Sequence, residues 1–199
     1  MGSLVSILLA GAGFSFSAGL NAYLPLLILA LADRMSSTID LESPYSGISS
    51  NVGILILLLV LPLELIADKI PRLDHFNDLL HTAIRPLVGA FCFMAVADQD
   101  GSLNVWVAGL LGMGIAGAVH VWKMRSRPGV AAGSQGLGTP FVSVLEDALS
   151  IVLAIFAAFL PWATIALIPV SVWLLRRSYS RMTLGESRMV RPFLPKTPA

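Results

Sequence analysis

Long apolar runs separated by short polar segments make up most of this chain. A helix needs about 20 mostly apolar residues to cross the hydrocarbon core of a membrane, so each run near that length predicts one spanning helix. The pattern predicts six of them, at residues 4–32, 52–68, 79–97, 103–123, 140–160 and 162–178. The second and sixth are short for a span. We therefore expect an all-α integral membrane protein: a compact bundle of about six transmembrane helices, some of them short, broken or re-entrant.

The composition agrees with a membrane protein. Hydrophobic residues make up 56% of the chain, charged residues only 13%, and the mean hydropathy is +0.80, values that exclude an ordinary soluble domain. The single cysteine, Cys92, has no partner for a disulfide or for a cysteine-based metal site. We expect a transmembrane domain at residues 1–180 and a basic, proline-containing cytoplasmic tail at 181–199. The lipid bilayer is the expected partner, and no nucleic acid is expected.

The basic residues fall on one side of the predicted membrane. With six spans and a cytoplasmic N-terminus, Arg34 is the one basic residue on the far side, and Arg85 lies just inside the third helix. Lysine and arginine in short loops stay in the cytoplasm, so this distribution supports six spans. It predicts that both termini are cytoplasmic.

A dense group of charged residues occupies the sequence ELIADKIPRLDHFNDLLHTAIRP, residues 64–86. Much of it is typical of a polar cytoplasmic turn, but Glu64 and Asp68 end the second predicted helix, and His81 and Arg85 lie in the first two turns of the third. Ionisable groups within a span are costly, and they normally face the bundle interior or a water-filled cavity. We expect these four side chains, together with Asp78, to contribute to an ion-binding or substrate-binding site.

The spacing of this group allows a second interpretation. Asp74, Asp78, His81 and Arg85 stand at i, i+4, i+7 and i+11, which is one stripe of a helix if the third helix begins early. Asp74, Asp78 and His81 could then relay protons or hold a divalent cation, the one cofactor that the sequence suggests, because carboxylate and imidazole groups are metal ligands. The alternative is an amphipathic juxtamembrane helix in which Arg85 pairs with Asp78 or Glu64.

A glycine-rich segment precedes the fifth predicted helix in GVAAGSQGLGTPFVSVLEDALS, residues 129–150. Gly136, Gly138 and Thr139 could form an anion-binding loop, since glycine lets the backbone approach a ligand and free N–H groups at a helix start attract anions. The segment lacks the Gly-Lys-Ser/Thr of a phosphate-binding P-loop. A flexible connector is the alternative.

Glu146 and Asp147 follow about two turns into that helix, roughly 10 Å below its start. Adjacent positions point about 100° apart, so the two carboxylates cannot easily share one partner. We expect one to meet Arg85 or Lys123 and the other to line a cavity. Both are predicted to belong to the ion-binding or substrate-binding site, since acids at membrane depth are normally functional.

Small residues interrupt the first predicted helix in GAGFSFSAGLNAYLP, residues 11–25. They either permit close packing against other helices or mark a broken helix whose ends face a midplane site. The fourth predicted helix carries a similar set in GLLGMGIAG, residues 109–117. The small-residue faces of helices one and four could therefore join two copies of the chain.

Two motifs carry a resemblance to a known family. The segments ADKIPRLDHFNDLLHTAIRPLVGA and GLGTPFVSVLEDALS resemble a bacterial membrane-protein family catalogued as domain of unknown function 4126 (DUF4126). The resemblance covers most of the chain, and the first motif is the more specific. It implies a compact multi-helix protein of the bacterial inner membrane, and the family label carries no established activity.

These observations favour a small membrane transporter or channel for an ion or small charged solute. The polar segments can converge on the cytoplasmic half of the bundle, where acids would bind a cation or proton and Arg85 would hold them apart. One alternative is a structural or accessory subunit with an internal network of ion pairs. Another is an enzyme that processes a lipid phosphate, although no familiar hydrolase motif is present, so enzymatic activity is not the expected function.

Overall fold

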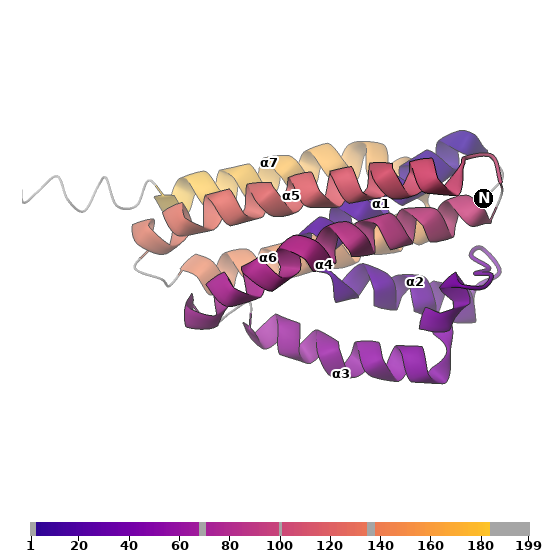
Figure 1. The fold of residues 1–199 in the computed structure, drawn as a ribbon. Helices are drawn as coiled ribbons and strands as arrows, with labels where there is room; N and C mark the ends of the chain where they lie inside the picture. Colours follow the sequence, from indigo (N-terminus) through magenta and orange to yellow (C-terminus); the bar gives the residue numbers. More distant parts are fainter. Residues whose placement is uncertain (1–2, 68–70, 100, 135–137, 184–199) are drawn as a thin grey trace, which may run out of the picture.

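The chain forms an elongated bundle of helices (Figure 1). The computed structural model describes residues 3–67, 71–99, 101–134 and 138–183, with the side chains of residues 67, 71–79 and 183 outside the description. Within these ranges there is no strand, so the predicted all-α membrane bundle is confirmed. The α-helices are α1 Leu4–Leu20, α2 Tyr23–Met35, α3 Asn51–Ala67, α4 Pro71–Asp98, α5 Val105–Gly133, α6 Gly138–Phe159 and α7 Thr164–Thr183. Two short 3-10 helices, η1 Tyr45–Ser49 and η2 Pro161–Ala163, complete the fold.

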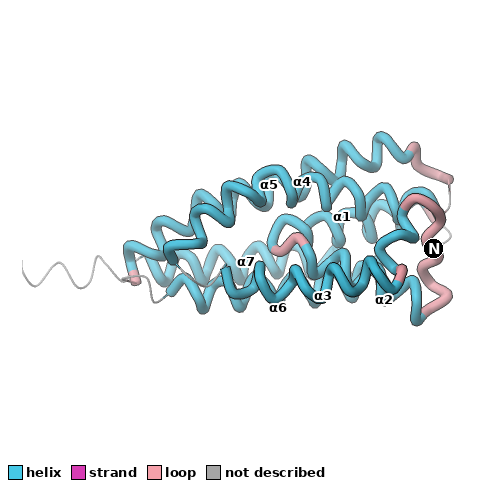
Figure 2. Tube along the Cα trace, turned by 60° about the horizontal axis from the view of Figure 1, so that its bottom comes forward, coloured by secondary structure: helices cyan, strands magenta, loops and turns pink. Residues whose placement is uncertain are grey.

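Helix α1 lies at the centre of the bundle, surrounded by α4, α5 and α6 (Figures 1 and 2). Its small residues make this possible. A side chain at Gly13 would collide with Ala157, and one at Gly19 would collide with Val119. These glycines pack inside the bundle, so the predicted oligomer contact through the first helix would need another face. A contact through α5, the fourth predicted helix, stays a prediction.

The predicted single helix over residues 4–32 is wrong, because the chain turns back at Asn21 and Ala22. Asn21 has extended backbone angles that end α1, and its side-chain oxygen accepts hydrogen bonds from the N–H groups of Tyr23 and Leu24, both at 3.1 Å, at the start of α2. The beginning of α1 and the end of α2 share a hydrophobic cluster that includes Ile7 and Leu29. Helices α1 and α2 are therefore a hairpin whose tip lies inside the bundle.

This hairpin changes the course of the chain. Helix α1 begins at one end of the bundle, and α7 ends at the other (Figure 1). The sequence predicted six spans with both termini on the same side, and the structure differs because the first predicted span returns to the end where it started. The predicted tail at 181–199 lies outside the described residues from 184 onward.

Three of the described helical segments are long and apolar enough to cross a membrane: Leu80–Asp98 within α4, then α5 and α6. Helix α1 and residues Asn51–Ile66 of α3 are apolar but shorter. Helix α5 continues to Gly133, ten residues beyond the predicted end at 123, so residues 129–133 of the predicted glycine-rich loop are helical. Asn104 caps the start of α5 by accepting hydrogen bonds from the N–H groups of Trp106 and Val107.

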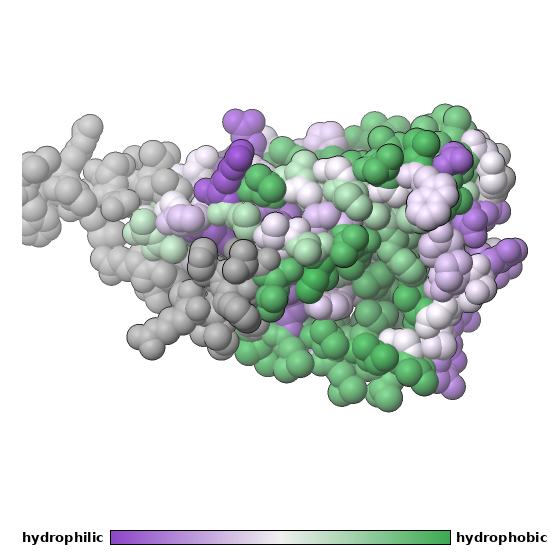
Figure 3. Space-filling model, in the orientation of Figure 1, coloured by the Kyte–Doolittle hydropathy of each residue, from purple (hydrophilic) through white to green (hydrophobic). Residues whose placement is uncertain are grey.

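The outer surface is strongly hydrophobic. Hydrophobic residues cover much of the middle of the visible face, and hydrophilic ones lie at its right-hand end and on the left, beside the grey residues (Figure 3). Helix α3 lies at the edge of the bundle and exposes large side chains, among them Leu59 at 63% and Leu63 at 66% (Figure 1). A soluble monomer rarely exposes so much apolar surface, whereas lipid covers it at no cost.

Helices α4 and α5 approach each other at Gly89 and Gly112. A Cβ atom at Gly112 would lie 2.9 Å from the Cβ of Phe93 and closer still to the backbone oxygen of Gly89. Neither the backbone of Gly89 nor the buried side chain of Phe93 can move aside easily. Gly114, two residues further along α5, has no atom within 4 Å of the position of a Cβ.

We expect Gly112→Ala to lower the free energy of unfolding by roughly 1–3 kcal/mol, because the two helices must separate. Gly114→Ala is the matched control, and it should be neutral or stabilising by up to about 1 kcal/mol, since alanine is the better helix former. Thermal unfolding of both variants in detergent, followed by circular dichroism, measures the difference. Equal stability of the two variants would contradict the close contact.

Candidate charged site at the tip of the helical hairpin

The tip of the hairpin places two helix ends inside the bundle. The last carbonyl groups of α1 and the first N–H groups of α2 have no partners within their own helices. Asn21 satisfies two of these N–H groups, as described above. Charged side chains from neighbouring helices contact three more of these groups, the carbonyl groups of Gly19 and Leu20 and the N–H of Ala22.

Two cations face the carbonyl end of α1. Lys123 on α5 donates a hydrogen bond to the carbonyl oxygen of Leu20 at 2.9 Å, and Arg85 on α4 donates one to the carbonyl oxygen of Gly19 at 3.4 Å. Both side chains are 0% exposed. The C-terminal end of a helix carries a partial negative charge, so cations stabilise it.

Glu64 on α3 faces the opposite end, the start of α2. Its Oε1 accepts a hydrogen bond from the N–H of Ala22 at 3.4 Å and from a guanidinium nitrogen of Arg85 at 3.2 Å, and it lies 3.2 Å from Nε2 of His81. Glu64 is only 3% exposed. Its second oxygen, Oε2, is buried and has no hydrogen-bond partner among the described residues.

Glu146 on α6 holds a second group of cations. Its Oε2 lies 3.0 Å from Nζ of Lys123 and 2.7 Å from a guanidinium nitrogen of Arg127, and its Oε1 accepts a hydrogen bond from the hydroxyl of Tyr179 on α7. All four residues are buried. Lys123 therefore connects Glu146 to the carbonyl end of α1.

Asp147 and His120 complete the site. The side-chain nitrogen of Asn21 donates to Oδ1 of Asp147 at 3.0 Å, which ties α6 to the turn of the hairpin. His120 lies with Nδ1 3.4 Å from Arg85 and with Nε2 3.2 Å from the hydroxyl of Thr82. Since arginine can only donate, Nδ1 accepts, and a neutral His120 carries its proton on Nε2.

We call this set of side chains the hairpin-tip cluster: Asn21, Glu64, His81, Arg85, His120, Lys123, Arg127, Glu146, Asp147 and Tyr179. Its three carboxylates, at 64, 146 and 147, equal its three lysine and arginine cations in number. Opposite charges therefore lie close together in this cluster, as low-dielectric surroundings require, because an uncompensated buried charge is very costly.

Several site residues predicted from the sequence come together in this cluster: Glu64, His81, Arg85, Glu146 and Asp147. Arg85 pairs with Glu64, one of its two predicted partners, and Glu146 meets Lys123, as expected for one acid of that pair. Asn21, His120, Arg127 and Tyr179 were not among the predicted site residues. Arg127 was placed in a cytoplasmic loop, although its i+4 spacing from Lys123 on the extended helix puts both on one face.

The other predicted sites are only partly described. Asp68 and Gly136 lie outside the described residues, as do the side chains of Asp74 and Asp78, so the divalent-cation hypothesis stays a prediction. The remaining described side chains form no group of three potential metal ligands.

Two residues of the predicted anion-binding loop are described. The N–H of Gly138 donates a hydrogen bond to the hydroxyl of Ser134 at 2.8 Å. This N–H therefore already has an acceptor within the protein. Thr139 is 3% exposed. The role of these residues in anion binding stays a prediction.

Glu146→Gln is expected to lower the free energy of unfolding by about 3–5 kcal/mol, because it leaves Lys123 and Arg127 buried without their shared carboxylate. Glu42→Gln, which removes an exposed carboxylate, should change it by less than about 0.5 kcal/mol. Denaturant or thermal unfolding in detergent compares the two variants. Wild-type stability of Glu146→Gln would show that this ion-pair group does not stabilise the bundle.

Comparison with known proteins places the chain in a family. The sequence profile described as domain of unknown function DUF4126 matches residues 8–181, a range that includes every residue of the hairpin-tip cluster. Comparisons with curated proteins and with solved structures found no match. The resemblance carried by the two motifs is thus confirmed, and the chain belongs to the DUF4126 family.

Proposed function

We propose that this protein is a small membrane transporter or channel for an ion or small charged solute, and that the hairpin-tip cluster is its binding site. One observation carries the proposal: two helix ends meet inside the bundle among ionisable side chains. Secondary transporters use discontinuous helices in this way, with half-helix ends directed at the substrate or coupling ion. Irregular backbone at membrane depth occurs where it is buried in protein or lines a cavity.

Buried charge supports a functional role for the cluster. A well-packed apolar group of similar volume is often as stabilising as a buried ion pair, or more so, so stability alone does not require these charges. Ionisable residues in spans typically mark ion pathways and proton relays. The cluster contains carboxylates and two histidines, which exchange protons, as well as cations that can hold an anion.

Glu64 is the proposed moving part. Among the described residues of α3, only Leu57 and Glu64 are buried, so the Glu64 carboxylate is a main link between this outer helix and the hairpin. Pro62 lies one half-turn before Glu64 and removes a backbone hydrogen bond within α3. Protonation of Glu64 would weaken its pairing with Arg85, release this end of α3 and open the cluster from the side.

The same proposal includes an orientation in the inner membrane of a bacterium. The exposed arginines Arg125, Arg176, Arg177 and Arg181 lie toward the end of the bundle where α5 and α7 finish, and Arg34 lies at the other end (Figure 1). By the positive-inside rule, the arginine-rich end is cytoplasmic. The C-terminal end of α7 is then cytoplasmic, and the start of α1 is on the opposite side, in place of the cytoplasmic N-terminus expected from six spans.

Proteoliposomes test the transport proposal. The purified protein is expected to dissipate an imposed gradient of H⁺, Na⁺, K⁺ or Cl⁻ faster than protein-free liposomes do. Glu64→Gln and Asp147→Asn should abolish that flux, because each removes a carboxylate of the cluster while preserving side-chain shape. Asp98→Asn, which removes an exposed carboxylate at the end of α4, should retain it.

The outcomes separate the hypotheses. Wild-type flux in Glu64→Gln and Asp147→Asn would remove the cluster from the pathway. If the wild-type protein transports none of these four ions, the structural alternative, a subunit with an internal ion-pair network, becomes the better explanation.

Cysteine labelling tests the orientation and the hairpin together. In a Cys92→Ala background, a membrane-impermeant maleimide added to intact spheroplasts should label both Ser3→Cys and Ser102→Cys, because α1 starts at the end of the bundle that holds the α4–α5 connection. Arg125→Cys, exposed at the other end, should react only after permeabilisation. Labelling of Ser3→Cys only after permeabilisation would restore the single span over 4–32.

A further inference from the structure

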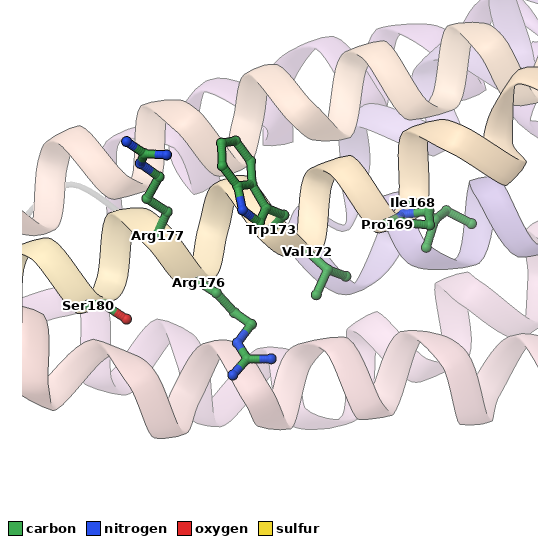
Figure 4. A pocket seen from close by; sticks show the side chains of 7 residues that line it. All are labelled: Ile168, Pro169, Val172, Trp173, Arg176, Arg177 and Ser180. Carbon is green, nitrogen blue, oxygen red and sulfur yellow. The ribbon is translucent and has the colours of Figure 1, made fainter.

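A groove on the outer face of α7 combines apolar and cationic walls. It encloses about 570 Å³, and its lining changes along the helix from Val172 and Trp173 to Arg176, Arg177 and Ser180 (Figure 4). This order runs from the middle of α7 toward its arginine-rich end. The groove therefore has an apolar part at membrane depth and a cationic part near the proposed cytoplasmic surface.

A second hollow extends the groove toward α5. It encloses about 460 Å³ and is lined by Phe16, Val119 and Trp122 as well as by Val172 and Arg176, which line the first groove too. Arg176 therefore stands where the two hollows meet. In Figure 4, Arg176 and Val172 extend to one side of α7, while Trp173 and Arg177 extend to the other.

The two guanidinium groups of the groove differ from the buried cations of the hairpin-tip cluster. Arg85, Lys123 and Arg127 each lie against a carboxylate or a carbonyl oxygen, whereas Arg176 and Arg177 are exposed and form no ion pair with any described carboxylate. The Arg177 guanidinium lies 5.1 Å from the ring centre of Trp173, which positions it by a cation–π contact. Both arginines are thus available to an external anion.

We propose that this groove binds an anionic phospholipid of the cytoplasmic leaflet. Arg176, on the side of the second hollow, holds the phosphate, since guanidinium groups form charge-assisted hydrogen bonds with phosphate oxygens, and Arg177 adds positive charge at the same level of α7. An acyl chain lies along Val172 and Trp122. Tryptophan beside arginine at the membrane interface suits such a ligand, because the indole ring spans the boundary between headgroup and hydrocarbon. The leaflet rests on the orientation proposed above, whereas lipid binding at the groove does not require transport.

Native mass spectrometry in detergent tests the site. The protein is titrated with phosphatidylglycerol, and with phosphatidylcholine as the zwitterionic comparison. Arg176→Gln with Arg177→Gln should weaken phosphatidylglycerol binding about 25-fold, roughly fivefold for each arginine. The control, Arg125→Gln with Arg181→Gln, removes the same charge from exposed positions outside the groove and should change binding less than about threefold.

A second variant tests the apolar part. Val172→Trp leaves both arginines in place but fills the point where the hollows meet, and it should also lower the number of bound phosphatidylglycerol molecules. Circular dichroism verifies that each variant keeps its helices. Equal losses of phosphatidylglycerol binding in the Arg176/Arg177 double variant and in the Arg125/Arg181 control would overturn the proposal in favour of diffuse attraction to basic residues. Unchanged phosphatidylglycerol binding in the Arg176/Arg177 variant would overturn it as well. So would wild-type protein that binds phosphatidylcholine equally well.

Discussion

Two helix ends inside the bundle carry partial charges, and side chains of the opposite charge face each of them. These contacts hold the bundle together. At the hairpin tip, Arg85 and Lys123 face the carbonyl end of α1, and Glu64 faces the amide end of α2. Away from water, each unsatisfied backbone group costs several kcal/mol, so the break persists only while these side chains are in place. The cations in turn need Glu64 and Glu146. These contacts therefore tie α3, α4, α5 and α6 to the hairpin.

The sequence predicts the continuous helices better than the broken one. Helices α4, α5 and α6 follow from apolar runs, because a run of that length has few alternatives in a bilayer. The run over 4–32 is equally apolar, and hydropathy cannot register a turn at Asn21. The local signal is an asparagine that can cap α2, followed by Pro25 in the first turn of that helix. The decisive contribution comes from Arg85 and Lys123, far along the chain, and no local pattern contains it.

The candidate site, too, could be predicted only in part from the sequence. Its acids could be predicted because a carboxylate at membrane depth is costly wherever it points. Their partners depend on where helices end, and α5 continues through Pro128 and Gly129, so Arg127 belongs to a helix face and not to a loop. Proline and glycine are weaker terminators in membrane helices, where neighbouring groups satisfy the freed backbone. Tyr179 reaches Glu146 only through the packing of α7, which periodicity does not define.

The hairpin has a consequence for biogenesis. The tip is synthesised before its partners exist: Glu64, Arg85, Lys123 and Asp147 follow it by roughly 40 to 125 residues, which at about 5–20 residues per second is about 2 to 25 seconds of synthesis. During that interval the polar turn at Asn21 has no protein surroundings to satisfy it. We therefore expect residues 4–35 to reach their final position only after α6 has been made.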